Sequence, residues 1–217
     1  MIGVFGGTFS PIHHGHLRLA VEAREQLRLD EVRLIPAARP PLRSTPGVPG
    51  ARRLRWVKLA IRGERGLVAD DREVRRPGPS YAVDTLVSLR SEFPRASLCL
   101  LLGQDAARKL PRWHRWRELP ALAHLVFFHR PGEQARFPAP LARLLRGRRA
   151  RSAAQLRGKT AGLWWRCELP PLHISASDIR ARLAARRSVR GLLPDAVLRD
   201  FSRKDVEAFA QDEKSAR

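Results

Sequence analysis

The sequence predicts an α/β fold with a mostly parallel, open sheet, and three observations carry this prediction. Short apolar segments alternate along the chain with longer segments of helical periodicity. One segment, "SLCLLLG", is apolar almost throughout, as strands buried on both faces of a parallel sheet tend to be. A glycine-rich stretch, "GGTFSPIHHGH", follows the first apolar segment and precedes the first helical one. In open parallel sheets this is where ligands bind.

The predicted elements follow one another in a regular order. We expect strands at residues 2–5, 31–36, 66–70, 97–103, 124–129 and 163–169. We expect helices at residues 16–29, 51–63, 81–93 and 177–187. The first helix carries Leu17, Ala20, Val21 and Leu27 on one side. Ser80 precedes the third helix and is expected to be its N-cap.

Length and composition indicate a globular protein. A chain of 217 residues, of which 43% are hydrophobic, is long enough to bury a core. We expect one domain over residues 1–200, with a helical C-terminal subregion from about residue 174, and a polar tail at residues 201–217. Met1 is followed by no pattern typical of a secretion signal, and the apolar runs are too short to cross a bilayer. We therefore expect a cytoplasmic protein in which Cys99 and Cys167 are buried, reduced thiols.

The net charge of +21 comes mostly from arginine and has three interpretations. The chain could bind nucleic acid, act on phosphorylated metabolites, or simply carry a compositional bias on its solvated faces. The densest run, Arg143 to Lys159, contains no acidic residue. Its simplest interpretation is an exposed, mobile basic loop.

The glycine-rich stretch has the chemistry of a phosphate site. Gly6 and Gly7 would let a ligand approach the backbone, and free N–H groups at a helix start favour an anion. His13 and His16 are three residues apart, so both imidazoles can point to one side and donate to phosphate oxygens. The stretch matches neither a P-loop nor a GxGxxG element. A zinc site with His14 is conceivable, but no cysteine or evident carboxylate partner is close in sequence, and we expect no metal ligands in the chain.

These residues resemble a known family. "GTFSPIHHGH" is similar to the GTFDPIHxGH element of the nucleotidyltransferase superfamily, with His13 and His16 at the two histidines of its HxGH core. "ISASDIR", residues 174–180, resembles the ISSTxIR element of that superfamily. Three further stretches, "IPAARPPLR", "RPGPSYAVDTL" and "GQDAARKLPRWHRW", resemble bacterial nicotinate-nucleotide adenylyltransferases. The resemblance extends to about Val197.

The resemblance implies a fold, an activity and partners. The fold would be Rossmann-like, with a doubly wound sheet and a small helical C-terminal end. The activity would be transfer of the adenylyl group of ATP to nicotinate mononucleotide, with Mg²⁺ carried by ATP. Alternatives are another small adenylyl- or cytidylyltransferase, an enzyme that accepts both nicotinate and nicotinamide mononucleotide, or, outside this class, a nucleic-acid-binding protein. We expect the two small-molecule substrates as partners of a monomer or homodimer, and neither a membrane nor nucleic acid.

The resemblance also implies site residues. For catalysis these are His13, His16 and Arg180. For ATP they are Gly6, Gly7, Thr8, Phe9, Gly15, His16, Ile174, Ser175, Ser177, Arg180, Gly103 and Asp105. For nicotinate mononucleotide they are Arg43, Ser80, Tyr81, Ala82, Asp105, Trp113 and His114. Trp113 would stack on the pyridine ring, whereas Trp116 is expected in the core.

The chain departs from the family pattern at several positions. Ser10 replaces the usual Asp, Leu42 and Arg43 replace His-Lys, and Ala82 occupies a position that is often Thr. In the second element, Ala176 and Ser177 replace Ser-Thr. We expect Arg43 to make a phosphate contact and Ser10 to be a turn residue without a catalytic part.

Overall fold

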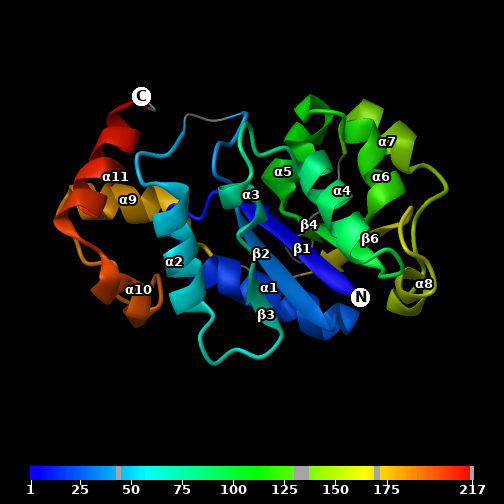
Figure 1. Cartoon of the computed structure of the whole chain (residues 1–217), viewed down its shortest axis with the longest axis horizontal. Coiled ribbons are helices and arrows are strands. Elements are labelled where there is room, and N and C mark those ends of the chain that lie inside the picture. Colours follow the sequence, from blue (N-terminus) through cyan, green and yellow to red (C-terminus); the bar gives the residue numbers. More distant parts are fainter. Residues whose placement is uncertain (43–44, 130–136, 169–171, 216–217) are drawn as a thin grey trace. The chain divides into compact units, whose positions relative to one another are not determined.

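The computed structural model describes residues 1–42, 45–129, 137–168 and 172–215 (Figure 1). The chain divides into two compact units. Unit 1 comprises Met1–Gly6, Val21–Arg33 and Tyr81–Pro171, and unit 2 comprises Gly7–Ala20, Leu34–Ser80 and Leu172–Arg217. The chain passes between the units three times inside regular elements: a strand, a helix and a second strand. This is why the sequence contains no recognisable linker.

One six-stranded sheet, ordered β3-β2-β1-β4-β5-β6, forms the framework. Its strands are β1 (Ile2–Gly7), β2 (Glu31–Pro36), β3 (Leu67–Ala69), β4 (Leu98–Leu102), β5 (His124–His129) and β6 (Trp164–Glu168). The pairs β1–β4, β4–β5 and β5–β6 are parallel, with Gly3 opposite Cys99 and Leu101 opposite Val126. The strand order reverses direction at β1, which leads directly into the glycine-rich stretch. All six expected strands and the Rossmann-like, doubly wound arrangement are confirmed.

The four expected helices are confirmed, with ends that differ by a few residues. They are α1 (His14–Leu27), α2 (Gly50–Ala60), α4 (Ala82–Glu92) and α9 (Ala176–Ala184). The shorter helices were not predicted, because segments of three to seven residues show too little periodicity. They are α3 (Arg72–Arg75), α5 (Gln104–Lys109), η1 (Leu110–Arg112), η2 (Trp116–Glu118), α6 (Leu119–Leu122), α7 (Ala139–Leu145), α8 (Ala153–Arg157) and α10 (Asp195–Asp200).

The core of unit 1 lies around β4 and β5. Every residue of these two strands is buried, including Phe127, which packs beside Trp164 with ring centroids 6.3 Å apart. Cys99 and Cys167 are buried free thiols, as expected. Burial raises the pKa of each thiol to about 12, so both are protonated at neutral pH.

Unit 2 contains an aromatic cluster that includes the C-terminal segment. Trp56 of α2 lies 4.9 Å from Phe201 and 5.7 Å from Phe209, measured between ring centroids. Phe209 belongs to helix α11 (Arg203–Ser215) and is fully buried. Much of the segment expected to be a polar tail is therefore a packed helix, whose single large apolar anchor gives little periodic signal.

In the described part of the chain, no helix is long and apolar enough to cross a membrane.

Candidate phosphate and nucleotide site

The loop that follows β1 is shaped by a buried phenylalanine. Phe9 adopts φ of 47° and is 1% exposed. A Cβ atom at Gly7 would lie only 2.9 Å from its ring, so glycine at this position is needed to seat Phe9. Gly6 differs, because apart from its two chain neighbours no described residue has an atom within 4 Å of a Cβ placed there. Of the two glycines, Gly6 has the open surroundings that a ligand needs.

The structure brings the two motif histidines together at the start of α1. The rings of His13 and His16 are stacked, with centroids 3.7 Å apart and an interplanar angle of 28°. The rings of His16 and Phe9 meet edge to face, with centroids 5.0 Å apart and an interplanar angle of 80°. The backbone N–H of His16 donates to the carbonyl oxygen of His13 at 2.9 Å. Spacing alone predicted that the two imidazoles share one side.

Both imidazoles are neutral at pH 7. Burial, aided by the nearby His14, lowers the pKa of His13 to about 4. Burial also lowers the pKa of His16 well below its usual value, and His13 adds to this effect. Nδ1 of His13 is buried and has no hydrogen-bond partner among the described residues. A neutral pair of this kind can donate hydrogen bonds to a phosphate without carrying full charges before it binds.

Gly15 is explained by close packing between residues 7–16 and residues 174–180, which we call the first and second signature motifs. A Cβ atom there would lie 3.0 Å from Nδ1 of His13 and 3.4 Å from the carbonyl oxygen of Ile174. A side chain there would push against the imidazole of His13 and would also touch the second motif at Ile174. That motif starts α9, where the Oγ of Ser175 accepts from the backbone N–H of Asp178 at 3.0 Å. Ser175 is therefore the N-cap of α9.

Arg180 links the same two motifs. Its Nη1 donates to the backbone carbonyl oxygen of Ser10 at 2.9 Å, and its Nη2 donates to the Oγ of Ser177 at 3.1 Å. Ser10 is buried and lies in a turn, as expected, and its role in the contact comes from the backbone. The guanidinium is thus held at the junction of the loop after β1 and the first turn of α9.

A residue that we did not predict, Arg53 of α2, supports this loop. Its guanidinium is completely buried and donates to the carbonyl oxygens of Val48 at 3.0 Å, Ala38 at 3.3 Å, and Thr8. Burial lowers the pKa of Arg53 to about 10, so the group remains charged at neutral pH. Arg53 thereby connects Thr8 to the segment between β2 and α2, residues 37–49, which we call the proline-rich loop. The sequence did hold a signal, because Arg53 lies on the helical face of Trp56 and Val57.

Ser80 does not cap the third predicted helix, and that prediction was wrong. Helix α4 begins after Tyr81, with no side-chain cap among the described residues. The Oγ of Ser80 instead accepts from the backbone N–H groups of Ala38 at 2.9 Å and Arg39 at 3.2 Å. The hydroxyl is used to fix the proline-rich loop and is not available to the helix. Arg43, from the same loop, lies outside the described residues.

Unit 1 holds most of the residues expected to bind nicotinate mononucleotide, namely Tyr81, Ala82, Asp105, Trp113 and His114. The rings of Tyr81 and His114 stack, with centroids 4.3 Å apart and an interplanar angle of 29°. Trp113 is half-buried, whereas Trp116 is 7% exposed and belongs to the core, as expected. Ala82 is the first residue of α4, so its backbone N–H faces the helix entrance.

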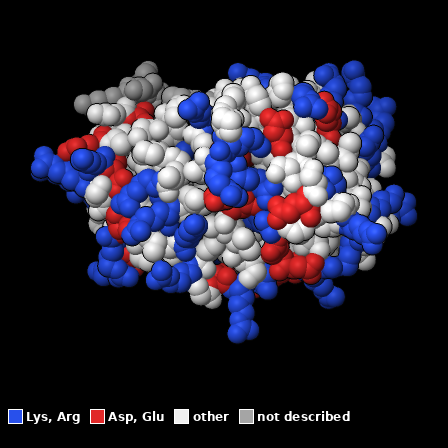
Figure 2. Space-filling view, in the orientation of Figure 1, with Lys and Arg blue, Asp and Glu red and all other residues white. Residues whose placement is uncertain are grey.

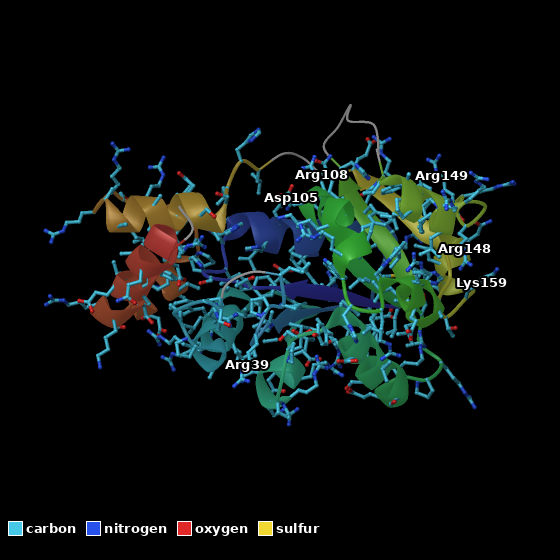
Figure 3. The ribbon with its side chains drawn as sticks, turned by 90° about the horizontal axis from the view of Figure 1, so that it is seen from above. Arg39, Asp105, Arg108, Arg148, Arg149 and Lys159 are labelled. Carbon is cyan, nitrogen blue, oxygen red and sulfur yellow. The ribbon has the colours of Figure 1, made fainter. Side chains whose placement is uncertain are left out.

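Asp105 and Gly103 lie at the start of α5. The carboxylate of Asp105 accepts from Nη2 of Arg108 at 2.7 Å (Figure 3). Both side chains are exposed, so this pair is worth little and can open when a ligand competes for the carboxylate. No described atom lies within 4 Å of a Cβ placed at Gly103.

Metal-ligating groups are scattered in the described chain. No three or more His, Cys, Asp or Glu side chains gather there in a way that could hold a metal ion. The zinc site considered for His13, His14 and His16 therefore has no support from the described residues.

Comparisons with known proteins agree with this arrangement. The family model of cytidylyltransferase-like proteins matches residues 4–182. A probable nicotinate-nucleotide adenylyltransferase of Aeromonas hydrophila is 46% identical over 196 residues, covering 90% of this chain and 92% of the relative. The corresponding protein of Halorhodospira halophila is 48% identical, with 90% of each chain covered.

Solved structures show the same fold. The nicotinic acid mononucleotide adenylyltransferase of Plasmodium falciparum, complexed with NaAD, superposes with a TM-score of 0.66. The alignment covers 97% of this chain and 94% of that one, at 14% identity. A putative nicotinate-nucleotide adenylyltransferase of Vibrio parahaemolyticus gives a TM-score of 0.59 at 16% identity, with 91% of this chain and 96% of that one covered. At these identities the likeness is one of fold.

Proposed function

This chain belongs to the nicotinate-nucleotide adenylyltransferases, within the cytidylyltransferase-like family, and we propose how its residues carry out the family's reaction. The enzyme transfers the adenylyl group of ATP to nicotinate mononucleotide in NAD biosynthesis. The observation that carries the proposal is the stacked, neutral pair of His13 and His16, packed against the second signature motif.

We propose a direct, in-line displacement. A phosphate oxygen of nicotinate mononucleotide attacks the α-phosphorus of ATP, the bond from that phosphorus to the bridging oxygen breaks, and pyrophosphate leaves. Because the substrate supplies the nucleophile, the protein forms no covalent intermediate. Its task is to position the two phosphates and to stabilise the negative charge that develops between them. Mg²⁺ enters as part of the MgATP substrate and is held by phosphate oxygens.

His13 and His16 donate hydrogen bonds to the α- and β-phosphate oxygens. Their neutral state fits this role, since each imidazole keeps one N–H and needs to transfer no proton. Thr8 and the backbone of Phe9 seat the triphosphate, and the open position of Gly6 leaves room for it. The buried Arg53 keeps this loop in place from behind.

The first turn of α9 receives the leaving pyrophosphate. Ser175 caps one backbone N–H, that of Asp178, so the N–H groups of Ala176 and Ser177 remain directed at the helix entrance. Arg180 adds a guanidinium that its bonds to Ser10 and Ser177 hold in a fixed position. The negative charge that accumulates on the bridging oxygen is stabilised by the backbone N–H groups of this turn and by the guanidinium of Arg180.

Unit 1 supplies most of the groups for nicotinate mononucleotide. Trp113 stacks on the pyridine ring, and the N–H groups at the start of α4, near Ala82, receive its carboxylate. Tyr81 and His114 form one side of this pocket through their stacked rings. Asp105 accepts from a ribose hydroxyl in place of Arg108. Arg43 remains the proposed contact to a phosphate, and we propose that the enzyme acts in the cytoplasm as a monomer or homodimer.

A comparison of two substrates tests the proposal. The measurement is kcat/KM for nicotinate and for nicotinamide mononucleotide at one fixed MgATP concentration, with pyrophosphate release as the readout. An amide presents an NH₂ group to backbone donors, so we expect a preference for nicotinate of about 10²–10³. Equal values would show dual specificity, and no turnover of either would refute the assigned activity. Trp113→Ala should weaken both substrates and leave the preference largely unchanged.

A further inference from the structure

A set of basic side chains in unit 1 takes no part in the proposed reaction. It comprises Arg143, Arg146, Arg148, Arg149, Arg151 and Lys159, and we call it the basic surface. All six residues are exposed. Lys and Arg gather over the region of α7 and α8 in Figure 2, and Figure 3 shows Arg148, Arg149 and Lys159 pointing outward there.

The backbone that carries these side chains is fixed along the edge strand of the sheet. The backbone N–H of Trp164 donates to the carbonyl oxygen of Arg148 at 2.9 Å. The backbone N–H of Ala150 donates to the carbonyl oxygen of Trp164, also at 2.9 Å. The indole of Trp164 donates to the carbonyl oxygen of Leu145 at 3.1 Å, at the end of α7. The guanidinium of Arg149 lies over the same indole, 5.5 Å from the ring centroid. The sequence suggested a mobile loop, whereas the structure shows a held segment.

The C-terminal part of the basic surface is anchored as well. Leu156 is fully buried, and its carbonyl oxygen accepts from the Oγ of Ser97 at 2.9 Å. Nε2 of the buried His124 lies 3.0 Å from the carbonyl oxygens of both Leu156 and Lys159. The basic side chains therefore project from a backbone whose position is set by buried contacts.

The carboxylates that the structure describes do not neutralise the charges of the basic surface. Within the described part of the chain, no acidic side chain forms an ion pair with any member of the basic surface. Arg157, which lies between them in sequence, does have a partner, Asp30, at 3.7 Å. In unit 2, by contrast, Arg52 is paired with both Asp200 and Asp205. A fixed array of exposed, unpaired cations attracts a polyanion.

We propose that the basic surface binds the phosphate backbone of duplex nucleic acid without reading its sequence. Guanidinium groups match phosphate oxygens, and a duplex carries the high density of charge that such an array complements. No aromatic residue lies between Arg143 and Lys159 in the sequence. The neighbouring indole of Trp164 is already engaged, because the guanidinium of Arg149 lies over it and its N–H donates to the carbonyl oxygen of Leu145, so it is poorly placed to stack on the bases of a single strand. The exposed large apolar residues of the described chain are Leu42, Val87 and Leu172, outside this surface. It therefore lacks the apolar anchors of a membrane-inserting or protein-binding surface.

The salt dependence of binding tests this proposal. The probe is a fluorescent DNA duplex of about two helical turns, titrated at salt concentrations from about 50 to 200 mM, with anisotropy as the readout. If five phosphates are contacted, log K should fall with log salt with a slope of about −4 to −5. The test variant replaces Arg146, Arg148, Arg151 and Lys159 by Ser, and the magnitude of its slope should fall by about 3–4.

A control variant separates this surface from net charge. It replaces Arg62, Arg65, Arg187 and Arg199, which are exposed residues of unit 2, by Ser. The net charge changes equally, so retention of the wild-type slope by the control alone supports the proposal. Equal losses in both variants, no binding by the wild type at low salt, or tighter binding to phosphatidylglycerol vesicles than to the duplex would overturn it.

A milder variant and an activity assay guard against misfolding. Arg146→Ser combined with Arg151→Ser should lower the magnitude of the slope by about 2. Adenylyl transfer should be unchanged in every variant, because none of the replaced residues belongs to the proposed site. A variant that loses binding but keeps turnover is folded, so its loss of binding is due to the basic surface. If the wild type showed no transferase activity, the proposed function would fail, but the binding result would still stand.

Discussion

The guanidinium of Arg180 donates a hydrogen bond of 2.9 Å to the backbone carbonyl oxygen of Ser10, 170 residues earlier in the chain. This bond joins the loop after β1 to the first turn of α9, which are the two signature motifs. The second donor, Nη2, reaches the Oγ of Ser177 at 3.1 Å. A single planar group therefore fixes both halves of the proposed phosphate site.

Replacement of Arg180 by Lys should impair catalysis although the charge is kept. One ammonium group cannot reproduce a fork that bonds Ser10 and Ser177 and also meets the pyrophosphate. We expect kcat/KM to fall by about 10²-fold, with most of the loss in kcat. Ser10→Ala should stay close to the wild type, because the contact uses the backbone of Ser10. Steady-state kinetics of both variants would contradict this account if Ser10→Ala lost as much activity as Arg180→Lys.

Loss of His16 should lower the rate far more than it raises KM. If its N–H stabilises charge that develops in the transition state, His16→Ala should lose about 10²–10³ in kcat, or roughly 3–4 kcal/mol. Urea unfolding provides the control, because the ring also packs on His13 and Phe9. A folded variant that keeps the wild-type kcat would refute the role.

Stability should fall as the solution becomes acidic. The pKa of His13 is about 4 in the folded protein and near 6.5 in the unfolded chain, so only the unfolded chain takes up a proton between these values. This contribution to the free energy of unfolding is full above about pH 6.5 and is lost as pH falls towards about 4. The lowered pKa values of His16 and His124 act in the same direction.

Urea unfolding of the wild type and of His13→Gln at about pH 7 and about pH 5 measures this effect. The wild type should lose about 2 kcal/mol more than the variant between the two pH values. Identical pH dependences of the two proteins would mean that His13 titrates normally in the folded state.

Arg53 should be more important for stability than its neighbour Arg55. Arg53→Met leaves the buried carbonyl oxygens of Val48 and Ala38 without their donor and should cost about 3 kcal/mol in the free energy of unfolding. Arg55 is the matched control, since its side chain is 62% exposed and pairs with Asp200 at the surface. Arg55→Met should cost less than about 1 kcal/mol. If urea unfolding showed equal losses of the free energy of unfolding in the two variants, Arg53 would not have the supporting role assigned to it.

A further consequence concerns catalysis in Arg53→Lys. Lysine keeps a charge at this position but cannot reach three carbonyl oxygens at once, so the carbonyl of Thr8 is held less firmly. We expect KM for MgATP to rise several-fold, while the ratio of kcat/KM for nicotinate over nicotinamide mononucleotide stays unchanged. A change in that ratio would place the effect of Arg53 elsewhere.

The sequence predicted those features that depend on local pattern. The six strands and the helices α1, α2, α4 and α9 could be predicted because their apolar residues recur at the period of each structure. The contact between His13 and His16 follows from their spacing at a helix start. The burial of Arg53 could have been predicted too, because it shares a helical face with Trp56 and Val57.

Other features depend on segments that meet only in the folded chain. The hydroxyl of Ser80 could bond a helix N–H or the backbone at Ala38, and the sequence gives no means of choosing between them. The burial of Phe209 requires Trp56, which lies about 150 residues away and gives no local signal. The ion pair between Asp105 and Arg108 could have been predicted, because the two residues lie three positions apart.

The discontinuous composition of the two units has a consequence for synthesis on the ribosome. Unit 1 is complete once residue 171 has been made, whereas unit 2 combines residues 7–20 with a last segment that starts at residue 172. The histidine motif, among the first segments to emerge, therefore waits for almost the whole of translation before Arg180 reaches the carbonyl of Ser10. We predict that a nascent chain that stalls before α9 is inactive, because the loop after β1 then lacks its contact to Arg180.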